Sequence, residues 1–172
     1  MRLTGKLDAN VPVERAWTFL LDLNELAGCV PGLQSIEQVD DSTFNGVIGA
    51  KVGPIGGRFS FKATITERHP PDRLVVTMDG EESTTGSRMG ATITLALVLV
   101  DGGTRVSYLA EIALGGKLAI IGEMVLRATA GVLLNEFTQR MRRRLEASAG
   151  DSGEILPGAR RGDHPPAQGG LP

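Results

Sequence analysis

The stretch LGGKLAIIGEMVLRATAGVLLNEF, Leu114 to Phe137, decides the fold, because it predicts a long helix with apolar side chains on more than one side. Its first half holds five large apolar residues that cannot share one stripe of a 3.6-residue period. They are Ile120, Ile121, Met124, Val125 and Leu126. One side of such a helix packs on a sheet, and the other lines a cavity mouth, a dimer seam or a membrane-facing edge.

Three glycines, Gly116, Gly122 and Gly131, weaken this helix and suit the close approach of a ligand or a neighbouring backbone. We expect the helix to run from about Gly116 to Ala147. Its later half has a single apolar line, ending at Met141 and Leu145. At about 1.5 Å per residue it exceeds about 40 Å, enough to cross a sheet.

The segment before this helix alternates between strands and turns. Arg2 to Ala9 alternates apolar and polar residues, which predicts a half-buried strand. An amphipathic helix is expected after Pro12, followed by a short second helix over Asp22 to Ala27. Six further strands are predicted at Leu33 to Val39, Thr43 to Val52, Arg58 to Glu67, Arg73 to Asp79, Arg88 to Val100 and Thr104 to Leu114.

The short connections predict an antiparallel meander with one apolar face, so the fold class is α+β. We expect a curved seven-stranded antiparallel sheet wrapped around the long C-terminal helix, with one or two short helices after the first strand. Residues 1–147 form this single domain. Residues 148–172 are rich in Gly and Pro and are predicted to be a disordered tail.

Composition excludes several classes of protein. The chain has 172 residues, 41% hydrophobic but only 4% aromatic, and a net charge of -2, which argues against nucleic-acid binding. A single cysteine rules out an internal disulfide, and the N-terminus lacks the apolar segment of a secretory signal. We therefore expect a cytoplasmic protein without a membrane span.

Candidate chemistry is sparse. No metal site is expected, because His69, His164 and Cys29 have no second ligand nearby in sequence. No catalytic residue is assigned: Cys29 is interpreted as a small buried hydrophobe, and Glu81 and Glu82 as a solvated hairpin end. The sequence VGPIGG, Val52 to Gly57, lacks the Lys and Ser/Thr of a phosphate loop and is interpreted as a turn.

Four stretches in matching order resemble the family of the carbon monoxide dehydrogenase G subunit, within the START-like (SRPBCC) helix-grip superfamily. They are GCVPGLQSIE (Gly28 to Glu37), AKVGPIGGRFSFKATI (Ala50 to Ile65), GTRVSYLAEIALGGKLAIIG (Gly103 to Gly122) and FTQRMRRRL (Phe137 to Leu145). The resemblance covers residues 1 to 147.

The resemblance implies a non-catalytic accessory protein of a molybdenum hydroxylase of the carbon monoxide dehydrogenase type. Such a protein helps to couple the enzyme to the membrane, or to a lipophilic electron acceptor such as a quinone. It would be peripheral at the inner membrane face, although the tail lacks the anchoring segment of some relatives. The alternatives are a protein–protein adaptor without a small ligand, a homodimer through the helix face, and a START-like cyclase or hydrolase.

A ligand-sized cavity between sheet and helix follows from the resemblance and from the low aromatic content. A quinone or a lipid is the expected ligand, with no metal and no covalent cofactor. The predicted binding residues are Cys29, Val30, Pro31, Phe59, Phe61, Val76, Met78, Met89, Ile93, Leu95, Leu118, Ile121, Gly122, Met124 and Val125.

A cluster of arginines near the end of the helix has two interpretations. Arg140, Arg142, Arg143 and Arg144 offset the helix macrodipole, or they dock on anionic lipid or an acidic partner.

Overall fold

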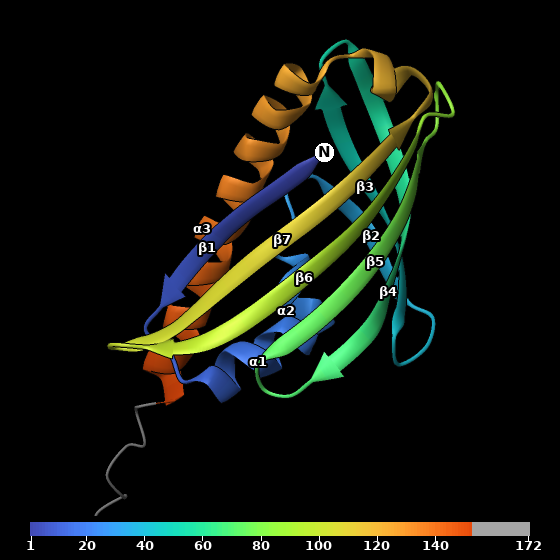
Figure 1. The fold of residues 1–172 in the computed structure, drawn as a ribbon. Coiled ribbons are helices and arrows are strands. Elements are labelled where there is room, and N and C mark those ends of the chain that lie inside the picture. Colours follow the sequence, from blue (N-terminus) through green and yellow to red (C-terminus); the bar gives the residue numbers. More distant parts are fainter. Residues whose placement is uncertain (153–172) are drawn as a thin grey trace, which may run out of the picture.

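Seven strands form one antiparallel sheet in the order β1-β7-β6-β5-β4-β3-β2, which confirms the predicted fold class (Figure 1). The strands are β1 (Arg2–Ala9), β2 (Leu33–Gln38), β3 (Thr43–Val52), β4 (Ile55–His69), β5 (Arg73–Glu82), β6 (Arg88–Val100) and β7 (Gly103–Gly115). The first strand pairs with the last, so the remaining strands form a meander whose neighbours in sequence are neighbours in space. The structure is a computed structural model that describes residues 1–152, with side chains to Ala147.

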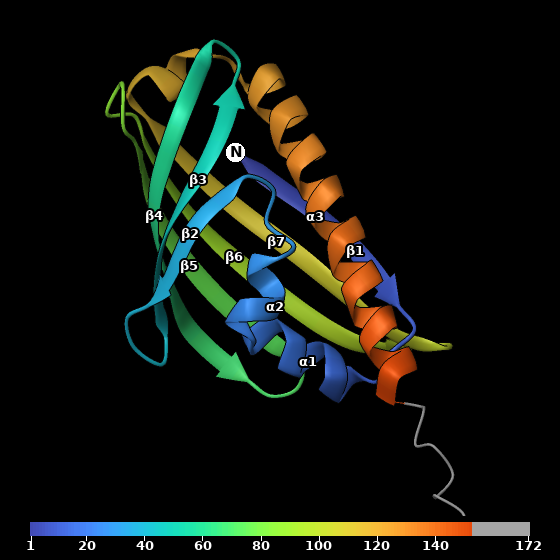
Figure 2. The ribbon, with the colours of Figure 1, turned by 180° about the vertical axis from the view of Figure 1, so that it is seen from behind.

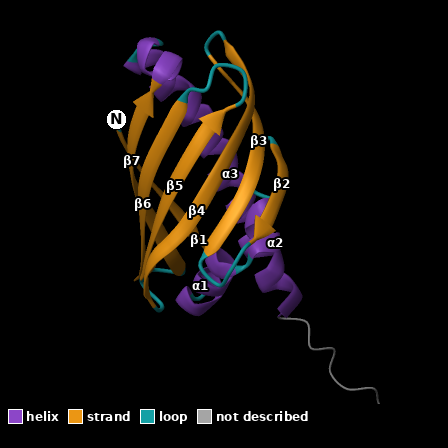
Figure 3. Cartoon of the chain, turned by 90° about the vertical axis from the view of Figure 1, so that its right-hand side faces the viewer, coloured by secondary structure: helices purple, strands orange, loops and turns teal. Residues whose placement is uncertain are grey.

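The sheet bends strongly, and three helices lie on its concave side (Figures 2 and 3). Helices α1 (Val13–Leu21) and α2 (Leu23–Ala27) follow β1, as predicted, and lie at one end of the concave side. The Asp22 carboxylate caps α2 by accepting hydrogen bonds from the backbone N–H groups of Asn24 and Glu25. Helix α3 (Glu123–Ser152) crosses the concave side beside β1.

The C-terminal helix differs from the prediction at both ends. A short 3-10 helix, η1 (Gly116–Ile120), precedes it. The helical conformation is interrupted at Gly122, whose φ is 96°. A positive φ is compatible with glycine but not with a continuing α-helix, so α3 begins at Glu123 instead of Gly116. It continues to Ser152 instead of ending at Ala147. The remainder of the predicted tail lies outside the described residues.

Three strands are longer than the sequence pattern indicates, and β7 gains only Gly103 and Gly115. Strand β4 begins at Ile55, because Val52 pairs directly with Ile55 across a turn of Gly53 and Pro54. The turn predicted over VGPIGG is therefore confined to these two residues, with Gly53 at φ of 57°. Strand β5 continues to Glu82, where its partner on β4 is Phe59.

The hydrophobic core occupies one end of the concave side, where α1 and the C-terminal half of α3 meet the sheet. We call this region the packed half. Phe19 of α1 and Leu145 of α3 are fully buried there, against Leu97 of β6. Its buried members are Leu7, Ala9, Val11, Ala16, Trp17, Phe19, Leu20, Cys29, Leu74, Leu97, Val106, Met141 and Leu145.

Candidate functional site: an apolar trough between the sheet and helix α3

The concave face of the sheet beyond the packed half is apolar. The strand register places Phe61 opposite Gly80 and Met78 opposite Ala91. It also places Ile93 opposite Val76, and the side chains of one such row point to the same face of a sheet. Seven predicted binding residues therefore share the inward face. They are Phe59, Phe61, Val76, Met78, Met89, Ile93 and Leu95.

These inward side chains are only half-buried, and of the seven Val76 and Leu95 pack against the packed half. An apolar side chain that points toward the helix and still reaches solvent borders space that protein atoms do not fill. Helix α3 makes its main contacts with the sheet at β1 and β3, so it bridges the concave side instead of lying on its floor. We call this apolar floor, together with the overlying first half of α3, the open half, and the space between the two the trough.

A hollow of about 460 Å³ lies where the open half meets the start of α3. Ile112 and Leu114 of β7 form one wall, and Leu126 of α3 forms the other. Met1, Ala113, Ala119 and Glu123 complete the lining. Sequence reasoning missed this wall, although Ile112 and Leu114 continue the inward alternation of β7.

Two larger hollows, of about 830 and 720 Å³, lie on the other face of the sheet. In the lining of the larger hollow, each strand contributes one inward residue and the two outward residues beside it, as in the run Ser60, Phe61 and Lys62. Such runs outline a groove between two rows of outward side chains, including the charged Glu81 and Arg88. Neither hollow belongs to the trough.

The structure does not bring all the predicted binding residues into the trough. Cys29 and Leu118 are fully buried, and Cys29 belongs to the packed half, where burial raises the pKa of its thiol. Val30 and Pro31 are half-buried in the turn before β2. Ligand binding by these residues stays a prediction.

The residues around the helix start also divide between two environments. Ile121 and Val125 pack toward Gly53 at the tip of the β3–β4 hairpin. Gly122 is exposed, and Met124 is 84% exposed, so it points away from the sheet. The two apolar sides of the helix are thereby explained: Leu126 and Phe137 face inward, whereas Met124 and Val132 face solvent.

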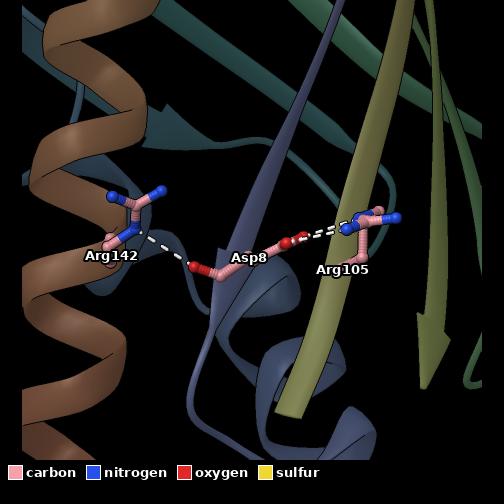
Figure 4. Close-up of polar contacts among 3 residues, drawn as sticks. All are labelled: Asp8, Arg105 and Arg142. Atoms are coloured by element: carbon pink, nitrogen blue, oxygen red, sulfur yellow. Dashed lines mark hydrogen bonds and ion pairs between the residues drawn. The ribbon is translucent and has the colours of Figure 1, made fainter. Parts of the chain in front are cut away.

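The arginine cluster is largely engaged within the molecule. Arg140 pairs with Glu136, and Arg144 lies 3.5 Å from the Glu25 carboxylate. The Arg142 guanidinium donates to the backbone carbonyl of Asp8, 3.1 Å away (Figure 4). The macrodipole interpretation fails, because α3 extends more than two turns beyond Arg144 and the effect is confined to the last turn. Docking by this cluster stays a prediction.

Glu82 corrects another expectation, because it is fully buried instead of solvated. Its carboxylate accepts hydrogen bonds from the Thr85 hydroxyl and from the backbone N–H groups of Thr84 and Thr85, at 2.6 to 2.8 Å. These donors lower the pKa of Glu82 from 4.5 to about 2. The charged carboxylate thus organises the β5–β6 loop, whereas Glu81 is exposed, with the Arg88 guanidinium 4.0 Å away.

Tyr108 of β7 is an inward-facing residue that the sequence analysis did not single out, in one row of the sheet with Leu95 and the buried Leu74. It lies directly opposite Gly5 of β1, where a Cβ would overlap the tyrosine hydroxyl. Burial raises the pKa of Tyr108, so its hydroxyl stays protonated and can donate a hydrogen bond. The alternation of Val106, Tyr108 and Ala110 on β7 was the signal that could have identified it.

No group of three or more His, Cys, Asp or Glu side chains gathers into a potential metal site within the described part of the chain. None of the helices in residues 1–152 is long and apolar enough to cross a membrane.

Comparison with known proteins identifies the family. The family of the carbon monoxide dehydrogenase G subunit (CoxG) matches residues 5–146. This chain belongs to that family. No curated protein matches this chain in sequence.

Solved structures share the fold of this CoxG-family domain. A conserved protein from Geobacillus kaustophilus is 21% identical, with a TM-score of 0.79 over 86% of this chain and 97% of its own. A START superfamily protein from Mycobacterium smegmatis is 8% identical, with a TM-score of 0.65 over 86% of this chain and 98% of its own. A protein from Chromobacterium violaceum is 16% identical, with a TM-score of 0.63 over 85% and 98%. At these identities the likeness establishes the fold alone.

Proposed function

We propose that this protein is a non-catalytic accessory protein that carries an apolar molecule, such as a quinone or a lipid, in the trough. It serves a molybdenum hydroxylase of the carbon monoxide dehydrogenase type, as the family description suggests. The observation that carries this proposal is the half-burial of Phe61, Met78 and Met89 on the inward face. When a ligand covers apolar surface that the fold leaves accessible, the burial contributes about 25 cal/mol of favourable free energy per Å².

A quinone suits both kinds of surface in the trough. Its isoprenoid or alkyl tail would cover the apolar floor, which needs no directional contact. Its carbonyl oxygens would accept a hydrogen bond from Tyr108, the protonated hydroxyl beside Gly5. Pockets of this type combine a mainly apolar lining with a few polar groups that orient the ligand.

Two alanines of β6 offer a matched test of ligand binding in the trough. Ala91 faces inward, opposite Met78, whereas Ala96 is exposed on the outer face. We expect Ala91→Phe to weaken decylubiquinone binding at least about tenfold, because the ring occupies the space of the ligand. Equilibrium dialysis measures the affinity, and Ala96→Phe should bind as the wild type does.

Stability provides the internal control of that test. Ala91→Phe should change the free energy of unfolding by less than about 1 kcal/mol, because the added ring enters unfilled space. If wild-type protein binds neither decylubiquinone nor phospholipid extracted from its native host, the carrier proposal is wrong. The adaptor alternative would then remain.

A further inference from the structure

One end of the molecule gathers three connections beside the hollow under α3. The β3–β4 hairpin meets the helix start, since a Cβ on Gly53 would lie 3.4 Å from the side chains of Ile121 and Val125. The β5–β6 loop joins them, because the Ser83 N–H donates to the Arg58 carbonyl at 2.9 Å. Gly116 of η1 in turn packs on Ser87. We call this end, seen at the top of Figure 1, the trough end.

The trough end exposes large apolar side chains. Ile120 is 82% exposed and Met124 is 84% exposed, on either side of the break at Gly122. Val132 continues the exposed apolar line along α3, two turns beyond Met124, at 68% exposure. Adjacent large apolar side chains that point together into solvent mark an interaction surface.

Basic side chains accompany this apolar surface. Lys51, Arg58 and Lys117 are exposed at the trough end. Among the described residues, no carboxylate lies within 4.0 Å of these three cations. The charge of these three groups is therefore free to attract an anionic partner.

The exposed acidic side chains at the trough end have arginine partners, whereas the buried Glu82 carboxylate is held by hydrogen bonds. Glu123 pairs with Arg127 at 2.6 Å, and Glu81 has Arg88 beside it. The turns at the opposite end carry exposed carboxylates, namely Asp40, Asp41, Asp72 and Asp101. Exposed arginines also lie near these turns, namely Arg68, Arg142 and Arg143, so the attraction of an anionic surface to the trough end is a local effect of Lys51, Arg58 and Lys117.

We propose that the trough end docks on the surface of an anionic lipid bilayer, with Ile120 and Met124 inserted among the headgroups. Apolar side chains that penetrate the interface and lysines that attract anionic lipid are the two components of peripheral membrane binding. Lysine is depleted at protein interfaces, which favours a bilayer over a protein partner. The docking proposal rests on the proposed function in one respect. Docking by the trough end would place the hollow lined by Leu126 against the membrane, and a lipophilic ligand would enter there.

Flotation of the full chain with vesicles tests the apolar component. Wild-type protein should bind vesicles of phosphatidylglycerol and phosphatidylcholine, but not phosphatidylcholine alone. The double variant Ile120→Ser, Met124→Ser should bind at least about tenfold more weakly, because it loses the inserted side chains. Val98→Ser, Leu99→Ser is the matched control, since these exposed residues, at 50% and 78%, lie in β6 at the opposite end of the sheet.

A second pair of variants tests the charge component. Lys51→Gln, Lys117→Gln should weaken vesicle binding about thirtyfold, and high salt should remove that difference. Lys6→Gln, Lys62→Gln removes the same charge from exposed strand positions away from the trough end and should change binding little.

The outcomes separate docking from ligand carriage. If both trough-end variants float with vesicles like the wild type, or if the wild type does not float, membrane docking is wrong. A concentration-dependent dimer that Ile120→Ser, Met124→Ser dissociates would identify a second copy as the occupant and would also overturn the proposal. Decylubiquinone binding without vesicles should be unchanged in all these variants. Failure of membrane docking would therefore leave the carrier proposal standing, and failure of ligand binding would leave the docking proposal standing.

Discussion

The two halves of the concave side contain the same elements but differ in how they are filled. In the packed half, α1 and the end of α3 bury Phe19, Leu97 and Leu145 to 2% exposure or less. In the open half, the same sheet and the same helix leave Phe61 and Met78 half-buried. The difference arises because α1 and α2 fill one end only, and α3 alone bridges the other.

This comparison separates stability from function. Close packing supplies the free energy that holds the fold, and a domain of this size has enough residues to concentrate it in one half. The other half can then keep apolar surface uncovered for a ligand. Large apolar residues in α3 should therefore have opposite roles, depending on whether they lie near Leu145 or near Met124.

The largest expected effect follows directly from this contrast within one helix. Leu145→Ala should lower the free energy of unfolding by about 3 kcal/mol, because it removes a fully buried side chain and leaves a cavity. Met124→Ala, at the exposed start of α3, should cost less than about 0.5 kcal/mol. Urea denaturation followed by circular dichroism measures both. Similar losses in the two variants would show that burial does not decide what a side chain of α3 contributes to stability.

The sequence alone predicted the sheet and its inward face well. Alternation on β4, with Phe59, Phe61 and Ile65 on one side, requires only that one face be buried, and the strand register confirms it. The helix start was mispredicted because apolar content does not reveal backbone dihedrals. Gly116 and Gly122 adopt φ of 68° and 96°, which divide the segment into η1 and α3.

The candidate site was predicted less completely than the fold. Burial of Glu82 depends on a loop that folds back over its own carboxylate, which no periodicity encodes. Cys29 was predicted both to be a small buried hydrophobe and to bind the ligand, and the structure places it in the packed half. For Met124, the sequence indicated two apolar sides of the helix without saying which one faced the sheet. Only the tertiary arrangement assigns each residue to a half.

An intermediate effect is expected at the inward-facing Tyr108, and it concerns the choice of ligand instead of stability. Tyr108→Phe keeps the ring against Gly5 but removes the hydroxyl that would donate to a quinone carbonyl. We expect decylubiquinone to bind about tenfold more weakly, the loss of one hydrogen bond. Dodecylbenzene, which has no carbonyl, should bind equally to both proteins in equilibrium dialysis. Equal loss for both ligands would mean that the ring, and not the hydroxyl, supports binding.

The smallest effect is expected at Asp8, where an ion pair and a hydrogen bond add to the packing of α3, β1 and β7. The Asp8 carboxylate accepts two hydrogen bonds from Arg105, at 2.7 and 2.8 Å, while its backbone carbonyl accepts one from Arg142 (Figure 4). Arg105 holds the pKa of Asp8 below its ordinary value of 3.8. Because the pKa is lower in the folded state, the pair stabilises the fold above pH 3.8 and loses this contribution as the pH falls through the lowered pKa.

Asp8→Asn should therefore be slightly less stable than the wild type at neutral pH, and the difference should shrink in acid below the ordinary aspartate pKa. The substitution retains the backbone bond to Arg142, so α3 keeps its position on β1. Urea midpoints of both proteins across this pH range measure the effect, with Asp79→Asn as a control, since no arginine or lysine pairs with that exposed carboxylate among the described residues. A difference that stays constant with pH would mean that Asp8 acts through its shape and not its charge. A loss as large as that of Leu145→Ala would mean that charge also holds the packed half together, against the division drawn between the two halves.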